Sequence, residues 1–99
     1  MNKLAPLKDL VNKQECTRVV VRLSKEESAF LYFTMESNEG LCFYSTLEHE
    51  NGQAYRDVEI YSPIDLYPEL ERLLNFLKTE IHFETISITQ NVVSNHPQK

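Results

Sequence analysis

The stretch Arg18-Val-Val-Val-Arg-Leu23 has the alternation of a β-strand from the middle of a sheet. Val19, Val21 and Leu23 would share one face, and the other face would carry Val20 between the two arginines. An apolar run with arginines on one side only is typical of a central strand that packs one face on the core. We therefore expect the fold to be built around this strand.

A helix is predicted directly after this strand. Ser24 and Glu27 have the spacing of a capping box, in which a serine hydroxyl and a glutamate carboxylate bind the first backbone amides of a helix. Gly40 can adopt the left-handed conformation that commonly ends a helix. The segment between Ser24 and Gly40 is therefore expected to be helical.

Two alternating strands are predicted next, at residues 41–47 and 54–61, on either side of Asn51-Gly52. This dipeptide is typical of a type I′ hairpin turn, because both residues tolerate a positive φ. In the second strand Val58 and Ile60 would point inward. We expect one outward face to carry Cys42, Tyr44, Tyr55, Asp57, Glu59 and Tyr61.

The chain then returns to helical spacing. Ser62-Pro63 would break the strand, Asp65 would cap a helix, and Pro68 is tolerated in the first turn of that helix. An apolar stripe ending near Glu80 would face the sheet, formed by Leu66, Leu70, Leu73, Leu74 and Leu77. A last strand would be anchored by Ile86 and Ile88, with Thr85, Ser87 and Thr89 opposite.

This βαββαβ order predicts an α+β fold, a two-layer sandwich with a four-stranded antiparallel sheet and two helices on one face. The expected arrangement is ferredoxin-like, with the strands in the spatial order fourth, first, third, second. Arg18 and Arg22 would then lie beside Asp57 and Glu59 on the helix-free face, as opposite charges on neighbouring strands.

The predicted domain covers residues 16–90 and is followed by a polar tail at 91–99. Residues 1–15 are expected to form an arm with apolar side chains at Leu4, Leu7, Leu10 and Val11. The default expectation is a frayed arm, and the spacing is also compatible with a short helix that docks on the domain or on a partner chain.

Composition limits the classes of function. The chain has 99 residues and a net charge of −5, which argues against a nonspecific nucleic-acid binder and against adsorption to an anionic membrane. The N-terminus lacks the continuous apolar region of a signal peptide, and no stretch is long enough to span a membrane. We therefore expect a cytoplasmic protein with reduced thiols.

No set of residues points to catalysis, to a metal or to a cofactor. His49, His82 and His96 are not spaced as ligands on one helix, and Cys16 and Cys42 match no zinc or redox motif. The only two glycines are explained as turn residues, so a glycine-rich phosphate loop is absent. The sequence predicts a protein that is not an enzyme.

Three known kinds of domain share this βαββαβ layout and can be compared with the chain. Acylphosphatases resemble it, but they need a glycine-rich loop after the first strand, where this chain has Leu23-Ser24-Lys25. RNA-recognition domains need aromatic residues on both central strands, and here the first strand has none. An amino-acid-sensing ACT-like domain, with a small ligand near Ser24, stays open as the alternative function.

Three segments together resemble a small uncharacterised bacterial family, one of the domains of unknown function. They are the run Val19-Val-Val-Arg-Leu-Ser, the helix end Glu36-Ser-Asn-Glu-Gly-Leu41, and the helix from Pro63 to Leu77. The resemblance covers about residues 18–81. It implies a bacterial origin and a ferredoxin-like fold, and it transfers no site residue.

The predicted function is association with another protein or with a second copy of the chain, through the helix-free face of the sheet. Tyrosine is enriched at interfaces because its ring is apolar and its hydroxyl is polar. The expected interaction surface has Val20 as its apolar centre, and it comprises Val20, Arg22, Tyr44, Asp57, Glu59 and Tyr61.

Overall fold

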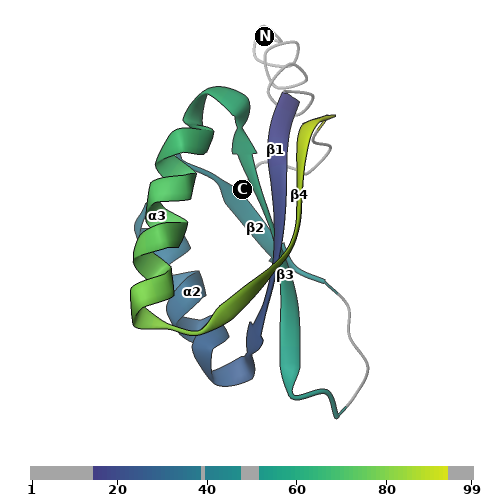
Figure 1. Cartoon of the computed structure of the whole chain (residues 1–99), viewed down its shortest axis with the longest axis vertical. Helices are drawn as coiled ribbons and strands as arrows, with labels where there is room; N and C mark the ends of the chain where they lie inside the picture. Colours follow the sequence, from purple (N-terminus) through teal and green to yellow (C-terminus); the bar gives the residue numbers. More distant parts are fainter. Residues whose placement is uncertain (1–14, 39, 48–51, 94–99) are drawn as a thin grey trace, which may run out of the picture.

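A computed structural model describes residues 15–38, 40–47 and 52–93 of the chain (Figure 1). The elements follow the order β1 (Glu15–Ser24), α2 (Lys25–Ser37), β2 (Phe43–Thr46), β3 (Tyr55–Pro63), η1 (Ile64–Leu66), α3 (Tyr67–Glu80) and β4 (Phe83–Val93). Most of the predicted arm, residues 1–14, lies outside the described residues, as does Asn51 of the predicted hairpin turn.

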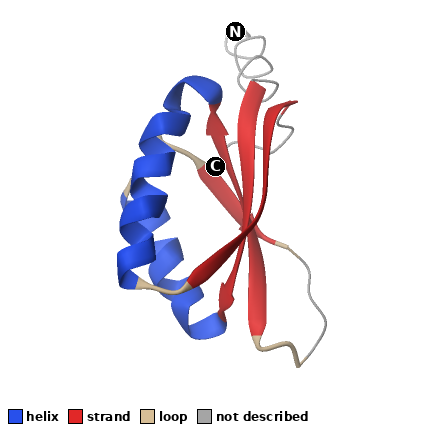
Figure 2. Cartoon of the chain, in the orientation of Figure 1, coloured by secondary structure: helices blue, strands red, loops and turns tan. Residues whose placement is uncertain are grey.

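The four strands form one antiparallel sheet in the order β2-β3-β1-β4. Helices α2 and α3 lie on one side of this sheet, and its other side carries no described helix (Figure 2). The predicted α+β class, with four antiparallel strands and two helices, is confirmed.

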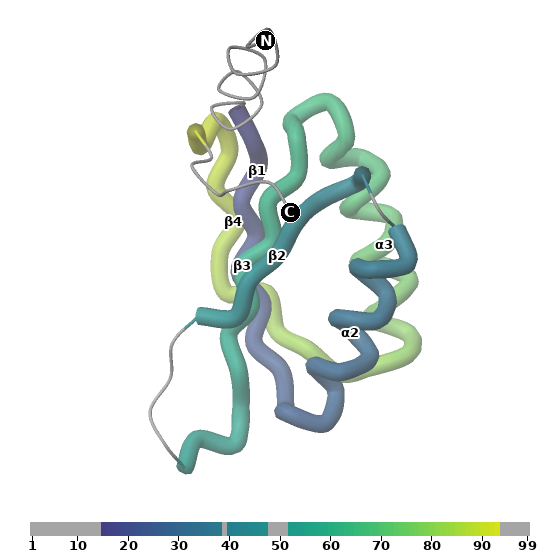
Figure 3. The backbone as a smooth tube through the Cα atoms, turned by 180° about the vertical axis from the view of Figure 1, so that it is seen from behind, coloured from purple at the N-terminus to yellow at the C-terminus, as the bar shows by residue number. Residues whose placement is uncertain are grey.

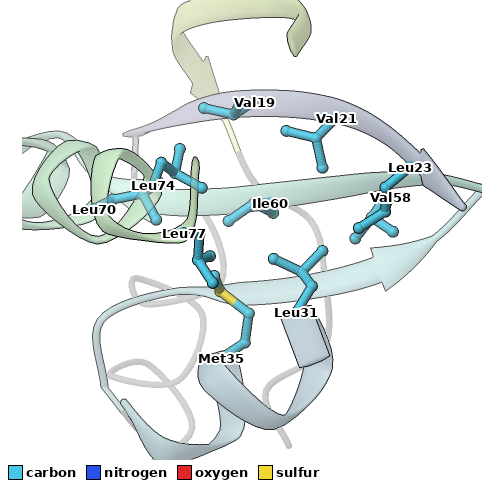
Figure 4. Close-up of a cluster of buried hydrophobic side chains, with 10 residues drawn as sticks. All are labelled: Val19, Val21, Leu23, Leu31, Met35, Val58, Ile60, Leu70, Leu74 and Leu77. Atoms are coloured by element: carbon cyan, nitrogen blue, oxygen red, sulfur yellow. The ribbon is translucent and has the colours of Figure 1, made fainter. Parts of the chain in front are cut away.

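The core lies between the sheet and the two helices (Figure 4). Alternate residues of β1 and β3 point toward the helices. The buried leucines of α3, Leu70, Leu74 and Leu77, pack against them and belong to the apolar stripe that the sequence predicts. The cluster consists of Val19, Val21, Leu23, Leu31, Met35, Val58, Ile60, Leu70, Leu74 and Leu77.

The start of α2 is capped by Ser24, as the sequence predicts. The Ser24 hydroxyl accepts a hydrogen bond of 3.1 Å from the backbone N–H of Glu27. The Glu27 carboxylate accepts the backbone N–H of His82 at 3.1 Å, beyond the end of α3. Glu27 therefore connects the first turn of α2 to the chain segment that leads into β4. Gly40 has the predicted positive φ, at +87°.

The face assigned to β2 from the sequence is wrong. Tyr44 lies opposite Ile60, and both point toward the helices, so Tyr44 and Cys42 pack against the core. The Tyr44 ring stacks on Tyr32 of α2, with 5.2 Å between centroids, and its hydroxyl donates a hydrogen bond of 2.7 Å to Glu36.

A shift of one residue explains this error. A two-residue turn at Asn51-Gly52 would place Tyr44 opposite Glu59, on the helix-free face. The observed pairing is offset by one residue, and such an offset moves every side chain of a strand to the opposite face.

Two details at α3 and β3 also differ from expectation. Asp65 lies inside the 3-10 turn, and α3 begins after Leu66 without a capping side chain. Ser62 and Pro63 are the last residues of β3 and do not break it. Pro68 does occupy the first turn of α3, which ends at Glu80 as predicted.

Strand β4 is longer and more exposed than expected. It continues to Val93, so residues 91–93 of the predicted tail belong to the sheet. Ile86 and Ile88 do not anchor it to the core, because 43% and 52% of their surfaces remain exposed. The upper part of β4 runs on the side of the molecule away from α2 and α3 (Figure 3). The helices therefore leave these two side chains uncovered.

Candidate interaction surface

On the helix-free side of the sheet, alternate residues of three of its four strands, β1, β3 and β2, form the candidate surface. Pairing places Arg18 opposite Tyr61, Val20 opposite Glu59, and Arg22 opposite Asp57. On β2 the residues that share this side are Phe43, opposite Tyr61, and Ser45, opposite Glu59. We call this side the open face, formed by Arg18, Val20, Arg22, Phe43, Ser45, Tyr55, Asp57, Glu59 and Tyr61.

One end of the open face is organised by Arg22. Its Nε and Nη2 atoms donate hydrogen bonds of 2.8 and 3.0 Å to the two carboxylate oxygens of Asp57. The same guanidinium lies 4.4 Å from the ring centroid of Tyr55. The planar fork of arginine allows it to bind the carboxylate and to stack on the ring at the same time. These contacts hold Arg22 and Tyr55 in one arrangement.

The centre of the open face is organised by Glu59, which is buried although charged. Its carboxylate accepts hydrogen bonds from Arg18 at 3.0 Å and from Ser45 at 2.8 Å, and a longer one from Tyr61 at 3.4 Å. A buried carboxylate needs such partners, since an unpaired charge away from water is costly. Glu59 therefore joins all three strands of the face.

The other end of the open face is aromatic. Phe43 and Tyr61 stack across β2 and β3, with 5.4 Å between ring centroids and 11° between ring planes. The sequence interpretation included Tyr61 and missed Phe43 and Ser45, because it had assigned them to the other side of β2. The correct offset between β2 and β3 would have identified both.

Val20 does not act as an accessible apolar centre. It lies on the open face, but only 6% of its surface is exposed. Its neighbours Arg18 and Arg22 carry long apolar stems, which can cover a small side chain in the middle of a sheet. The apolar area that a partner could contact on this face belongs to the aromatic rings.

Two titratable side chains of the open face, Arg22 and Tyr61, have raised pKa values. The hydrogen bond to Asp57 keeps the pKa of Arg22 above its ordinary value. Burial raises the pKa of Tyr61, and the negative charge of Glu59 raises it further, so Tyr61 stays neutral. Arg22 is therefore charged and Tyr61 neutral at any physiological pH.

The thiols are not activated. Burial raises the pKa of Cys42 to about 12, and its thiol contacts the sulfur of Met35 at 3.4 Å. Burial also raises the pKa of Cys16. Because the thiolate is the reactive form of cysteine, both side chains are packing residues.

Among the described residues, no three His, Cys, Asp or Glu side chains are grouped as metal ligands. His82 is exposed after α3, and His49 and His96 lie outside the described residues. None of the described helices is long and apolar enough to cross a membrane.

Comparisons with known proteins find no matching family, no matching curated protein and no matching solved structure.

Proposed function

We propose that this chain is a non-catalytic, ferredoxin-like protein-interaction module of the bacterial cytoplasm, and that it binds another protein through the open face. The observation that supports this proposal is the fixed arrangement of aromatic and arginine side chains on that face. Arg22 is held by Asp57 and Tyr55, and Tyr61 is stacked on Phe43.

Two physical arguments favour protein binding. Tyrosine, phenylalanine and arginine are enriched where proteins bind each other, and tyrosine and arginine dominate the residues that contribute most binding energy. Side chains that are already ordered lose little further entropy when a partner arrives. The paired charges would orient the partner, and the rings at the two ends of the face would supply the buried contact.

The ACT-like alternative receives no support from the residue on which it depended. The Ser24 hydroxyl is engaged in capping α2, and the site proposed for the ligand begins at that residue.

The proposal is tested by site-specific photo-crosslinking in cells. A benzophenone amino acid replaces Tyr61 on the open face in one variant, and replaces Phe33 in the control variant. Phe33 lies on α2, on the other layer, and is 68% exposed, so it is at least as accessible to chance collisions. We expect a discrete crosslinked protein from position 61 and none from position 33.

The result is interpreted by comparing the two positions. A crosslink from position 33 alone, or equal products from both positions, would contradict the proposal. Loss of the position-61 product when Arg22→Ala is added would show that the partner contacts the organised face and not a neighbouring loop.

A further inference from the structure

Strand β4 forms an edge of the sheet, and over most of its length its sequence lacks the charges and prolines that commonly protect an edge. Among the described residues β1 is its only strand partner. From Thr85 to Val93 the strand contains no charged residue and no proline. Natural edge strands are commonly blunted by lysine, proline or short length, because their free backbone groups can pair with another chain.

The side chains of this edge are also unusually apolar for a surface. Ile86, Ile88 and Val93 are 43%, 52% and 50% exposed. Ile88 lies opposite Val19, on the side of the helices, and Ile86 is an extra residue without a partner on β1. Residues with high β-propensity, no charge and no proline favour association through strands. The other edge, β2, offers only the four residues Phe43–Thr46.

The sequence of β4 indicates which partner fits. Thr85-Ile86-Ser87-Ile88-Thr89 reads the same in both directions. In an antiparallel pair related by a two-fold axis at Ser87, each Ile86 would lie opposite Ile88 of the second copy. The register shift at Ile86 places Thr85 on the helix side, opposite Val21, and Thr89 on the open face, opposite Arg18, so the threonines do not extend this pairing. Isoleucine pairs stabilise neighbouring strands, and a two-fold axis requires self-complementarity.

We propose that two copies of this chain associate through their β4 edges, antiparallel and centred on Ser87, and so form one continuous eight-stranded sheet. The isoleucines of the two copies would supply the apolar contact across this pair. The extra residue at Ile86 increases the local right-handed twist of β4.

This proposal goes beyond the proposed function, because it uses a different surface. A two-fold axis perpendicular to the sheet would place the open faces of the two copies on the same side. The dimer would then present two copies of the open face next to each other. A partner with two matching segments would bind such a dimer more tightly than a single domain.

Analytical ultracentrifugation of the full chain over a hundredfold concentration range tests the proposal. We expect a monomer–dimer equilibrium, and the variant with Ile86→Lys and Ile88→Lys should raise its dissociation constant by more than about tenfold, since like charges would lie opposite each other. Thr46→Lys, on the β2 edge, should leave the dissociation constant unchanged. Circular dichroism of each variant establishes that it is folded.

A second measurement locates the axis without disturbing the apolar contacts. Under oxidising conditions Ser87→Cys should form a disulfide-linked dimer, because residues on a two-fold axis between paired strands have Cβ atoms within bonding reach. Thr46→Cys should not. A wild-type chain that stays monomeric, or a dimer that tolerates both lysines and forms no Ser87→Cys disulfide, overturns the proposal. The position-61 crosslink does not depend on β4, so the proposed function is judged separately.

Discussion

The guanidinium of Arg22 and the carboxylate of Asp57 face each other directly across β1 and β3, joined by two hydrogen bonds of 2.8 and 3.0 Å. The pair is partly shielded, and the Tyr55 ring beneath the guanidinium adds a cation–π contact. Geometry of this kind distinguishes it from an ordinary surface ion pair, which contributes little to stability.

The first prediction concerns this geometry. Arg22→Lys keeps the positive charge, but lysine can neither bind both carboxylate oxygens in a planar fork nor stack on Tyr55 in the same way. We expect the urea midpoint of unfolding to fall. The control is Arg72→Lys on α3, where Arg72 pairs with Glu69 on the exposed helix surface, and the midpoint should not change. Equal effects of the two substitutions would mean that the fork geometry is unimportant.

The second prediction tests the offset between β2 and β3. Tyr44→Ala removes a ring that packs on the core and stacks on Tyr32, so we expect a loss of about 2–3 kcal/mol in the free energy of unfolding. Tyr61→Ala removes a ring from the open face and should cost about 1 kcal/mol. Urea denaturation of both variants checks this order. A larger loss for Tyr61→Ala would place Tyr44 outside the core.

The third prediction concerns alkaline pH. Burial raises the pKa of Cys42 from 9.0 to about 12 in the folded chain, so the folded state retains a proton that the unfolded state releases. The resulting stability is fully present below pH 9 and is lost as the pH rises toward 12. Cys42→Ala removes this titration.

Urea denaturation at a series of pH values measures the effect. Between pH 9 and 11 the free energy of unfolding should fall more steeply for the wild type than for Cys42→Ala. Cys16, Tyr61 and Tyr67 titrate in both proteins and cancel in the comparison, whereas Tyr44 cancels only in part, because its pKa is raised by burial and also by the Cys42 charge. Parallel curves for the two proteins would show that the Cys42 thiol is not shielded from solvent.

The fourth prediction concerns the start of α2. Ser24→Ala removes the hydroxyl that accepts the Glu27 amide, and it should cost about 1 kcal/mol of stability. Ser37→Ala is the matched control at the other end of the helix. Among the described residues the Ser37 hydroxyl donates to the Phe33 carbonyl, which is already within the helix, so its loss should change stability by less than about 0.5 kcal/mol. Thermal unfolding of both variants measures the two losses of stability. Equal losses would contradict the prediction.

The strongly periodic segments could be predicted from the sequence. Alternation in β1 and the leucines of α3 are set by burial, and burial leaves a regular pattern along the chain. The arginine–carboxylate pairs of the open face followed from the same alternation, once β1 and β3 were taken as neighbours.

The errors arose where the side on which a residue lies depends on how two elements are placed relative to each other. Alternation in β2 shows which residues share a side, but it does not show which side faces the helices. That choice depends on the register of β2 against β3. A shift of one residue in this register puts Phe43, and not Tyr44, on the open face. In the same way, Ile86 and Ile88 looked like core residues, and nothing in the sequence shows that the helices do not extend over that part of β4.

The Glu27 carboxylate, which accepts the amide of His82, has a consequence for the order of folding. The two residues are separated by 55 positions, so this contact forms only after a long segment of chain has closed. The first turn of α2 and the entry to β4 would therefore reach their final structure together. Since β1 also waits for β3 and β4, most of the folding barrier would come from closing distant contacts and little from forming local turns.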